Sequence, residues 1–145
     1  MTIQCTIVPV TPYQQNCSII KCEATGKAAI VDPGGDVERI LAAVEQMQAS
    51  VEKIILTHAH LDHCAASDVL RKQLRVPIEG PHCEDEFWLQ GLPKACQMSG
   101  FPPADAFIPD RWLVQGDRVT VGEQTLQVIH RVMSYFSTRH KKWPG

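Results

Sequence analysis

The chain has 145 residues, of which 44% are apolar and 21% charged, and its formal net charge is −2. This length is enough for one domain with one core. The slight negative charge argues against a nucleic-acid-binding protein, because there is no basic surplus to meet phosphates. No apolar run approaches the length that crosses a bilayer, and the first residues lack the basic and apolar segments of a secretory signal. We therefore expect a cytoplasmic protein without a nucleic-acid or membrane partner.

Sequence patterns in the first half predict a sheet followed by helices. Alternating, β-branched residues predict strands over 3–10, 16–22 and 27–31, with a turn at Thr25-Gly26, as a meander. A tight turn over 32–35 precedes Asp36, which we expect to cap a helix. We expect a further strand over 53–57 and a helix over 62–75. The apolar positions expected to be buried in the two helices are Val37, Ile40, Leu41, Val44 and Met47, then Ala66, Val69, Leu70 and Leu74.

The second half predicts shorter elements. We expect a short strand over 76–78, a solvated acidic loop over 82–86, and a helical turn that Phe87-Trp88-Leu89 anchors. Residues 100–109 are proline-rich and predict a loop, and alternation over 112–129 predicts a β-hairpin region. The six cysteines form no Cys-x-x-Cys pair, so we expect reduced thiols packed as small hydrophobic side chains. A disulfide framework is the alternative.

Four potential metal ligands fall within six residues of the segment Thr57–His63, called here the metal-ligand segment. His58 and His60 are two residues apart, and in an extended chain such residues point to the same side, so both imidazoles can reach one ion. Asp62 and His63 follow at the start of the predicted helix and can turn toward a second position. Imidazole and carboxylate suit zinc, with iron or manganese as alternatives. His82 and Cys83 could form a third position, but no ligand pairs with them at strand spacing.

The string His58-Ala59-His60-Leu61-Asp62-His63 resembles the signature of the metallo-β-lactamase superfamily. The segments 31–35, 85–93 and 109–113 resemble the small bacterial type II glyoxalases, the hydroxyacylglutathione hydrolases. The resemblance covers residues 1 to about 130. It implies the N-terminal half of an αββα sandwich, an α/β (α+β) fold, with the turn at Asp32 lying beside the metal site.

The resemblance also implies a reaction and a ligand set. His58 and His60 would bind the first zinc ion, and Asp62 and His63 the second. In the resembled enzymes two metals activate a water molecule that attacks the thioester of a hydroxyacylglutathione such as lactoylglutathione, giving a 2-hydroxy acid and glutathione. Asp62 would also orient that water, which makes it the implied catalytic residue. The small-molecule partner would be a glutathione thioester, and the resemblance leaves the oligomeric state open.

The family pattern breaks after His130. Relatives continue with a Pro-Gly-His-Thr-Pro-Gly-His segment, whereas this chain continues Arg131-Val132-Met133-Ser134 and ends at Gly145. We assign neither His130 nor His140 as a ligand. DNA that encodes 131–137 can, read one nucleotide earlier, encode Pro-Gly-His-Val-Val-Phe-Phe, so we hypothesise a frameshift near Arg131 that makes 131–145 an aberrant tail. A natural short variant with its own ending is the rival explanation.

Four of the seven ligands that the resemblance implies are therefore assigned in this chain. We expect this truncated chain to bind zinc poorly, to have little or no activity, and to expose an apolar sheet face and unpaired strand edges. Two alternatives stay open. One is another hydrolase of the superfamily, such as a lactonase, and the other is a non-enzymatic remnant or a fragment that pairs with another chain.

Overall fold

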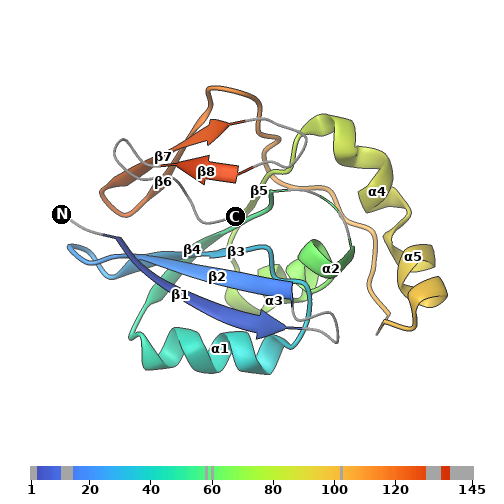
Figure 1. Cartoon of the computed structure of the whole chain (residues 1–145), viewed down its shortest axis with the longest axis horizontal. Coiled ribbons are helices and arrows are strands. Elements are labelled where there is room, and N and C mark those ends of the chain that lie inside the picture. Colours follow the sequence, from blue (N-terminus) through green and yellow to red (C-terminus); the bar gives the residue numbers. More distant parts are fainter. Residues whose placement is uncertain are drawn as a thin grey trace.

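The computed structural model describes residues 3–10, 15–57, 59, 61–101, 103–129 and 135–137, without the side chains of 15, 16, 61, 62, 128, 129 and 135–137. Two sheets lie one above the other, and helices cover the outer face of the larger sheet (Figure 1). This mixed α/β arrangement confirms the predicted fold class. Among the described residues, no helix has the length and apolar content that a membrane span requires.

The larger sheet has the strand order β1-β2-β3-β4-β5. β1 (Ile3–Val10), β2 (Gln15–Cys22) and β3 (Lys27–Val31) are antiparallel, which confirms the predicted meander. β4 (Ser50–Ile55) and β5 (Ile78–Glu79) continue the sheet in parallel. The carboxyl ends of β3, β4 and β5 therefore meet at one edge, and this is where the metal-ligand segment begins.

Helix α1 (Val37–Gln46) connects β3 to β4 and packs on the outer face of the sheet. Its predicted stripe is confirmed, because Ile40 is fully buried and Val37, Leu41 and Val44 pack against the same core. Asp36 does occupy the N-cap position, but the prediction that it caps the helix is wrong. Its φ and ψ are 49° and 52°, a left-handed conformation, and its side chain makes no cap hydrogen bond, whereas capping side chains normally extend from β-region backbone.

The helix predicted over 62–75 is two helices, α2 (Leu61–Cys64) and α3 (Ser67–Leu74). The break has a clear cause, since the Ala66 amide donates to the carbonyl oxygen of Pro33, at 3.0 Å, instead of to the preceding turn. Leu70 is buried as expected, but Val69 is 53% exposed, so its assignment to the core is wrong.

Asp68 in α3 is nearly buried and joins this helix to the loop over 100–109. Its carboxylate accepts a hydrogen bond from Arg71, at 2.6 Å, and pairs with Lys72 at 3.0 Å. The same Arg71 donates to the carbonyl oxygen of Ile108 at 2.9 Å. Burial of the Asp68 carboxyl raises its pKa, but the hydrogen bonds and charges of Lys72 and Arg71 outweigh burial and hold the pKa below its usual value.

Replacing Asp68 with Asn tests this pKa. A depressed carboxylate pKa stabilises the fold above the unfolded-state pKa, about 3.9, and this contribution is lost as the pH falls through the folded-state pKa. We expect the difference in unfolding free energy between the wild type and Asp68→Asn to be constant at neutral pH and to shrink below about pH 4. Urea denaturation across pH measures it, with the exposed Asp105→Asn as the control. A difference that does not change with pH would contradict the assignment.

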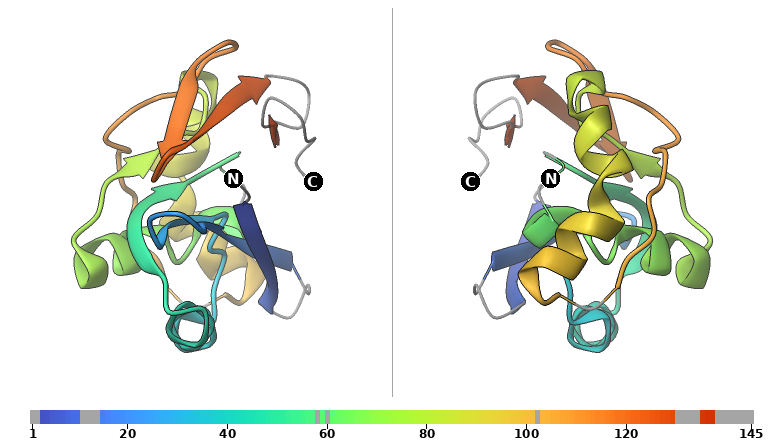
Figure 2. Two further views of the ribbon diagram at one scale, coloured as in Figure 1. Left: turned by 90° about the vertical axis from the view of Figure 1, so that its left-hand side faces the viewer. Right: turned by 90° about the vertical axis from the view of Figure 1, so that its right-hand side faces the viewer.

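The segment between β5 and the proline-rich loop is more helical than expected. The predicted acidic loop contains a 3-10 turn, η1 (Cys83–Asp85). The predicted helical turn is α4 (Glu86–Gln90), whereas α5 (Leu92–Ser99) was not predicted from the sequence. The prediction that three apolar residues anchor α4 is correct only for Leu89, which is fully buried. Phe87 and Trp88 are 63% and 45% exposed. Figure 2 shows α4 and α5 following one another along one side of the molecule.

The smaller sheet consists of β6 (Arg118–Val121), β7 (Gln124–Ile129) and β8 (Tyr135–Ser137), all antiparallel. It confirms the predicted hairpin, and β8 lies inside the segment expected as a tail. A second core forms between the sheets, so the expected exposure of the sheet face is wrong over β2, β3 and β4. Within β1 it holds for Ile7, which is 48% exposed, whereas Ile3 packs against this second core. The residues of this second core are Ile20, Ala29, Val31, Ile55, Leu113, Val119, Val121 and Leu126.

Candidate metal centre

Strand β4 fixes the start of the metal-ligand segment. The amide of Leu56 donates to the carbonyl oxygen of Glu79 at 2.9 Å, and Leu56 itself is 1% exposed. Thr57 follows with 6% exposure. His58 and His60, the predicted ligands of the first metal, lie outside the described residues. Asp62 lies in α2, but its side chain is also outside the description.

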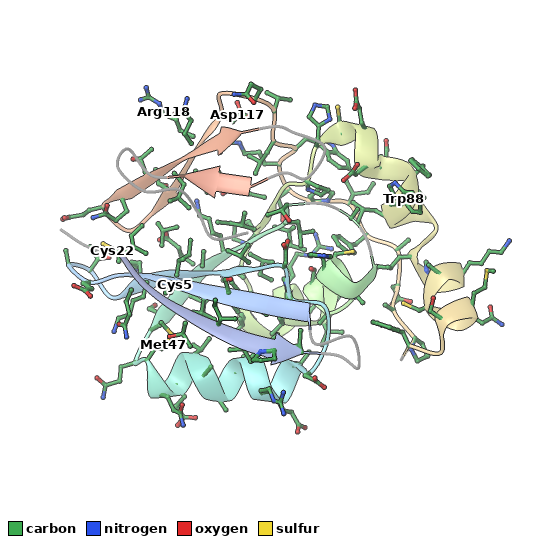
Figure 3. All side chains as sticks on the ribbon, in the orientation of Figure 1. Cys5, Cys22, Met47, Trp88, Asp117 and Arg118 are labelled. Carbon is green, nitrogen blue, oxygen red and sulfur yellow. The ribbon has the colours of Figure 1, made fainter. Side chains whose placement is uncertain are left out.

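His63 is the predicted ligand whose side chain is described, and it meets Asp32. Its Nδ1 lies 3.2 Å from Oδ2 of Asp32, and the two side chains are only 15% and 9% exposed. The Asp32 carboxylate also accepts from Thr57, at 2.8 Å from the backbone amide and at 2.6 Å from the hydroxyl. One buried carboxylate thus joins the end of β3, the end of β4 and helix α2 (Figure 3 shows the side chains in this region). The turn at Asp32 thus contacts Thr57 and His63 of the metal-ligand segment, and its place beside a bound metal stays a prediction.

The backbone around Asp32 is arranged for this contact. Its φ is 55°, in the left-handed region, which turns the chain sharply at the end of β3. Its amide donates to the carbonyl oxygen of Ile55 at 3.0 Å, so the turn is fastened to the neighbouring strand. Asp is among the residues that tolerate this conformation, and the three contacts of its carboxylate offset the strain. Nothing in the residue order alone separates this role from that of an ordinary turn.

The contact with Asp32 determines which nitrogen of His63 can bind a metal. A carboxylate offers only acceptor lone pairs, so Nδ1 carries the proton and donates to Oδ2 of Asp32. The lone pair then lies on Nε2, which is the nitrogen that would ligate. A metal-binding histidine held by a carboxylate in this way is the usual arrangement in metalloproteins.

Cys17 lies close to the Asp32 carboxylate, but its thiol is unreactive. It is fully buried in the core between α1 and the larger sheet. Burial strongly raises the pKa of its thiol, and the negative charge of Asp32 raises it further. Cys17 therefore stays a neutral thiol beside the site. All six cysteines are free, as predicted, although Cys5 and Cys83 are exposed instead of packed in the core.

A second carboxylate, that of Asp85, contacts the metal-ligand segment and was not identified from the sequence. Oδ2 of Asp85 accepts a hydrogen bond from the amide of Ala59 at 3.2 Å. Ala59 stands between His58 and His60 and is 2% exposed. Asp85 directly precedes α4, which is a typical capping pattern, yet its side chain does not cap that helix. No local signal identifies a contact between residues 26 positions apart.

The third metal position considered at His82 and Cys83 receives no support. Nδ1 of His82 accepts from the amide of Glu84 at 3.1 Å, so this ring is used to cap η1. Within the described part of the chain, no group of three His, Cys, Asp or Glu side chains could hold a metal ion. That part does not include the side chains of His58, His60 and Asp62.

The sequence of this chain matches a known protein family. The family model described as the metallo-beta-lactamase superfamily matches residues 10–133. The chain belongs to this superfamily. It is 39% identical over 125 residues to hydroxyacylglutathione hydrolase GloC of Haemophilus influenzae, covering 86% of this chain and 58% of the relative. It is 33% identical over 129 residues to an uncharacterized protein of Aquifex aeolicus, covering 86% and 57%. The chain thus spans a little over half the length of these superfamily relatives.

Solved structures of the superfamily share the fold. The BLEG-1 B3 metallo-beta-lactamase matches with a TM-score of 0.80 and 27% identity, over 94% of this chain and 68% of that one. TTHA1623 in a di-iron-bound form matches with a TM-score of 0.74 and 29% identity, over 86% and 60%. Membership of the superfamily implies a metal cofactor. The residues of this chain fit it, because the segment supplies three imidazoles and a carboxylate and Asp32 orients one of those imidazoles toward ligation.

Proposed function

We propose that this superfamily hydrolase is a zinc-dependent enzyme for hydroxyacylglutathione thioesters such as lactoylglutathione, releasing a 2-hydroxy acid and glutathione. The observation that carries the proposal is the 39% identity to the Haemophilus influenzae hydroxyacylglutathione hydrolase over 125 residues that include the metal-ligand segment. Other relatives of the same printed name match shorter parts of the chain, such as that of Rhodospirillum rubrum at 28% identity over 113 residues. The proposed setting is cytoplasmic.

The proposed site uses His58 and His60 for one zinc ion, and Asp62 and His63 for a second. Iron is the alternative metal, in line with the di-iron-bound relative. When bound, such ions lower the pKa of water and polarise a substrate carbonyl, so no protein nucleophile is needed. Asp62 has a second role as the catalytic residue that orients the attacking water.

Three residues that the structure describes hold the metal-ligand segment in position. Asp32 holds the Nδ1 proton of His63 and so keeps Nε2 as its lone-pair nitrogen. Thr57 fixes the position of that carboxylate through two hydrogen bonds. Asp85 holds the backbone between His58 and His60. Because outer-shell partners typically change metal affinity or activity by about 10–100-fold, we propose these three as positioning residues.

The test uses a chimeric protein, because four of the seven ligands that the family pattern implies are assigned in this chain. Residues 131–145 are replaced by the part of the Haemophilus influenzae relative that follows the matched region. We expect the zinc-loaded chimera to hydrolyse lactoylglutathione and to lose more than about 100-fold of kcat/KM on His58→Ala with His60→Ala, since even outer-shell changes cost up to that much. The 145-residue chain, assayed in parallel, should show little activity.

A panel of lactones and thioesters separates the second candidate function. A folded, metal-loaded chimera that opens lactones and leaves thioesters intact would replace the proposed function by that of a lactonase. The matched control is His82→Ala, because His82 caps η1 and takes no part in the proposed ligand set. Its kcat/KM should equal that of the chimera.

A further inference from the structure

We propose that Glu79 is a further positioning residue for the metal site, because it fixes the backbone from which the metal-ligand segment begins. Its carboxylate is held between the cations of Lys53 and Arg111, and its main chain holds the end of β4. Lys53, Glu79 and Arg111 are called here the charged cluster. This inference rests on the proposed function, since it assumes that the segment binds the metal ions.

The first observation is a path of contacts from the main chain of Glu79 to a proposed ligand. The carbonyl oxygen of Glu79 accepts from the amide of Leu56 at 2.9 Å. The next amide along the chain, that of Thr57, donates to the Asp32 carboxylate at 2.8 Å. The same carboxylate meets Nδ1 of His63 at 3.2 Å. A shift of Glu79 would therefore be transmitted to His63 through residues that the structure describes.

The second observation is the shortness of β5, to which Glu79 belongs. It has two residues, Ile78 and Glu79, whereas strands usually have roughly three to ten. Its main-chain pairing with β4 is therefore limited. The first residue has its own anchor, because the Asp110 carboxylate accepts from the amide of Ile78 at 2.8 Å. The position of the second residue depends on the contacts of the Glu79 side chain and on the chain that follows it.

The third observation is that the charged cluster lies between the two sheets. Nζ of Lys53 lies 3.0 Å from Oε2 of Glu79, and the two side chains are only 11% and 12% exposed. Nη1 of Arg111 lies 3.2 Å from the other carboxylate oxygen, Oε1. Ile55 follows Lys53 by two residues, pairs with Glu79 and belongs to the second core. Lys53 and Glu79 therefore share the face of the larger sheet that meets the smaller sheet.

Arg111 extends the charged cluster to the smaller sheet. Its Nη1 also donates to the carbonyl oxygen of Arg118, the first residue of β6, at 3.0 Å. Its Nη2 lies 3.9 Å from Oδ2 of Asp117, and Figure 3 shows Asp117 and Arg118 at the start of β6. Its carbonyl oxygen accepts from the amide of Gly80, directly after β5, at 2.7 Å. β5 is thus held against β4 by Lys53 and against the smaller sheet by Arg111.

The chemistry of the charged cluster favours a role in positioning. Apolar side chains of similar volume often hold buried surfaces together as well as an ion pair does, because desolvation offsets the attraction of the charges. Charge-assisted hydrogen bonds add geometric specificity, since each oxygen meets a defined donor. We therefore infer that the cluster fixes where Glu79 lies, and with it the amide of Leu56.

The first test measures amide hydrogen exchange by NMR in the metal-free 145-residue chain and in Glu79→Gln. We expect protection of the Leu56 amide to fall at least about tenfold relative to that of Ile54, a factor that matches the loss of a hydrogen bond to a charged group. Ile54 is the internal reference, because its amide donates to the carbonyl oxygen of Pro77, next to the residue that Asp110 anchors. A general loss of stability would lower both protections alike.

The second test measures zinc affinity by competition with a chromophoric chelator. Glu79→Gln should bind zinc about tenfold more weakly than the wild type, the lower end of what outer-shell changes cost. Glu52→Gln is the matched control. Glu52 is also a carboxylate on β4 that contacts the smaller sheet, since its Oε1 accepts from the amide of Gly122 at 3.0 Å. It stands five residues before Thr57, and its substitution should leave zinc affinity and the protection of Leu56 unchanged.

A double variant separates positioning from stability. Lys53→Met with Glu79→Leu removes both charges of the buried pair, so neither is left uncompensated, and urea denaturation should show stability close to that of the wild type. Protection of Leu56 and zinc affinity should stay as low as in Glu79→Gln. If both recover together with stability, the charged cluster only stabilises the fold and the inference is overturned.

The remaining outcomes distinguish this inference from the proposed function. Wild-type zinc binding that Glu79→Gln leaves unchanged, or an unchanged ratio of Leu56 to Ile54 protection, would overturn the role of Glu79 alone. A wild-type chain that binds no zinc would overturn the proposed metal site, and this inference with it.

Discussion

Replacing Asp32 with Asn should lower zinc affinity by about 10–100-fold and the free energy of unfolding by about 2 kcal/mol. The Asp32 carboxylate takes three hydrogen bonds, two from Thr57 and one from Nδ1 of His63. An amide has the same shape but only one acceptor oxygen, so it cannot accept all three. The loss in stability follows because hydrogen bonds to a charged group each contribute about 1.5–3 kcal/mol.

The loss in zinc affinity has a more specific cause. If the amide nitrogen that the Asp32→Asn substitution introduces faces His63, it donates to Nδ1, and the ring proton moves to Nε2. A protonated Nε2 has no lone pair for a metal, so His63 is held in the wrong tautomer. Asp32→Asn therefore prevents His63 from binding the metal without changing His63 itself.

Zinc affinity is measured by competition with a chromophoric chelator, and stability by urea denaturation. The control is Asp105→Asn, which removes an exposed carboxylate from the proline-rich loop. Thr57→Val is compared with Asp32→Asn, because it removes only the hydroxyl contact to Asp32 and leaves the His63 tautomer intact. It should cost stability and lower zinc affinity less than Asp32→Asn does, because the Asp32 carboxylate still accepts the Nδ1 proton of His63. An Asp32→Asn chain that binds zinc as the wild type does would show that Asp32 does not orient His63.

Replacing Gly80 with Ala should destabilise the fold by about 4 kcal/mol. Gly80 follows β5 with a φ of +89°, which L side chains rarely adopt. A Cβ at this position would overlap the backbone carbonyl oxygen of Leu56 and lie 3.1 Å from Cδ1 of Leu113. Because the obstruction is backbone, it cannot be relieved by turning a side chain. Leu56 directly precedes the metal-ligand segment, so the displacement would reach the site.

Gly116→Ala is a matched control for this substitution. Gly116 has the same φ of +89°, but a Cβ there would meet nothing within 4 Å. Its cost should be that of the left-handed backbone alone, about 1–2 kcal/mol. Thermal unfolding of both variants separates the two contributions. Equal losses of stability would mean that the contact with Leu56 is accommodated without cost.

The elements that the sequence predicted correctly are those with a local signal. The strands β1 to β4 and the hairpin of β6 and β7 show alternation or β-branched content, and α1 shows an apolar stripe at helical spacing. The break between α2 and α3 has no such signal, because it depends on the Pro33 carbonyl oxygen drawing the Ala66 amide out of the helix. Helix α5 was missed because Pro93 and a mixed polar composition hide its periodicity.

The same difference between local signals and long-range contacts applies to the candidate metal site. The ligand string can be identified because its four members lie within six consecutive residues. Their supports come from elsewhere in the chain, since Asp32 is 25 residues from Thr57 and Asp85 is 26 residues from Ala59. Such contacts are products of the fold. Only the resemblance to the superfamily could place Asp32 near the site beforehand, and nothing placed Asp85 there.

We propose that residues 57–63 form a metal site that Asp32 and Asp85 hold in place. The most direct test is a zinc competition titration of the 145-residue chain and of its His58→Ala, His60→Ala double variant, with His82→Ala as the control. We expect weak binding by the wild type, the same binding by the control, and binding at least about tenfold weaker by the double variant. Equal zinc affinity in all three proteins would contradict a metal site in this segment.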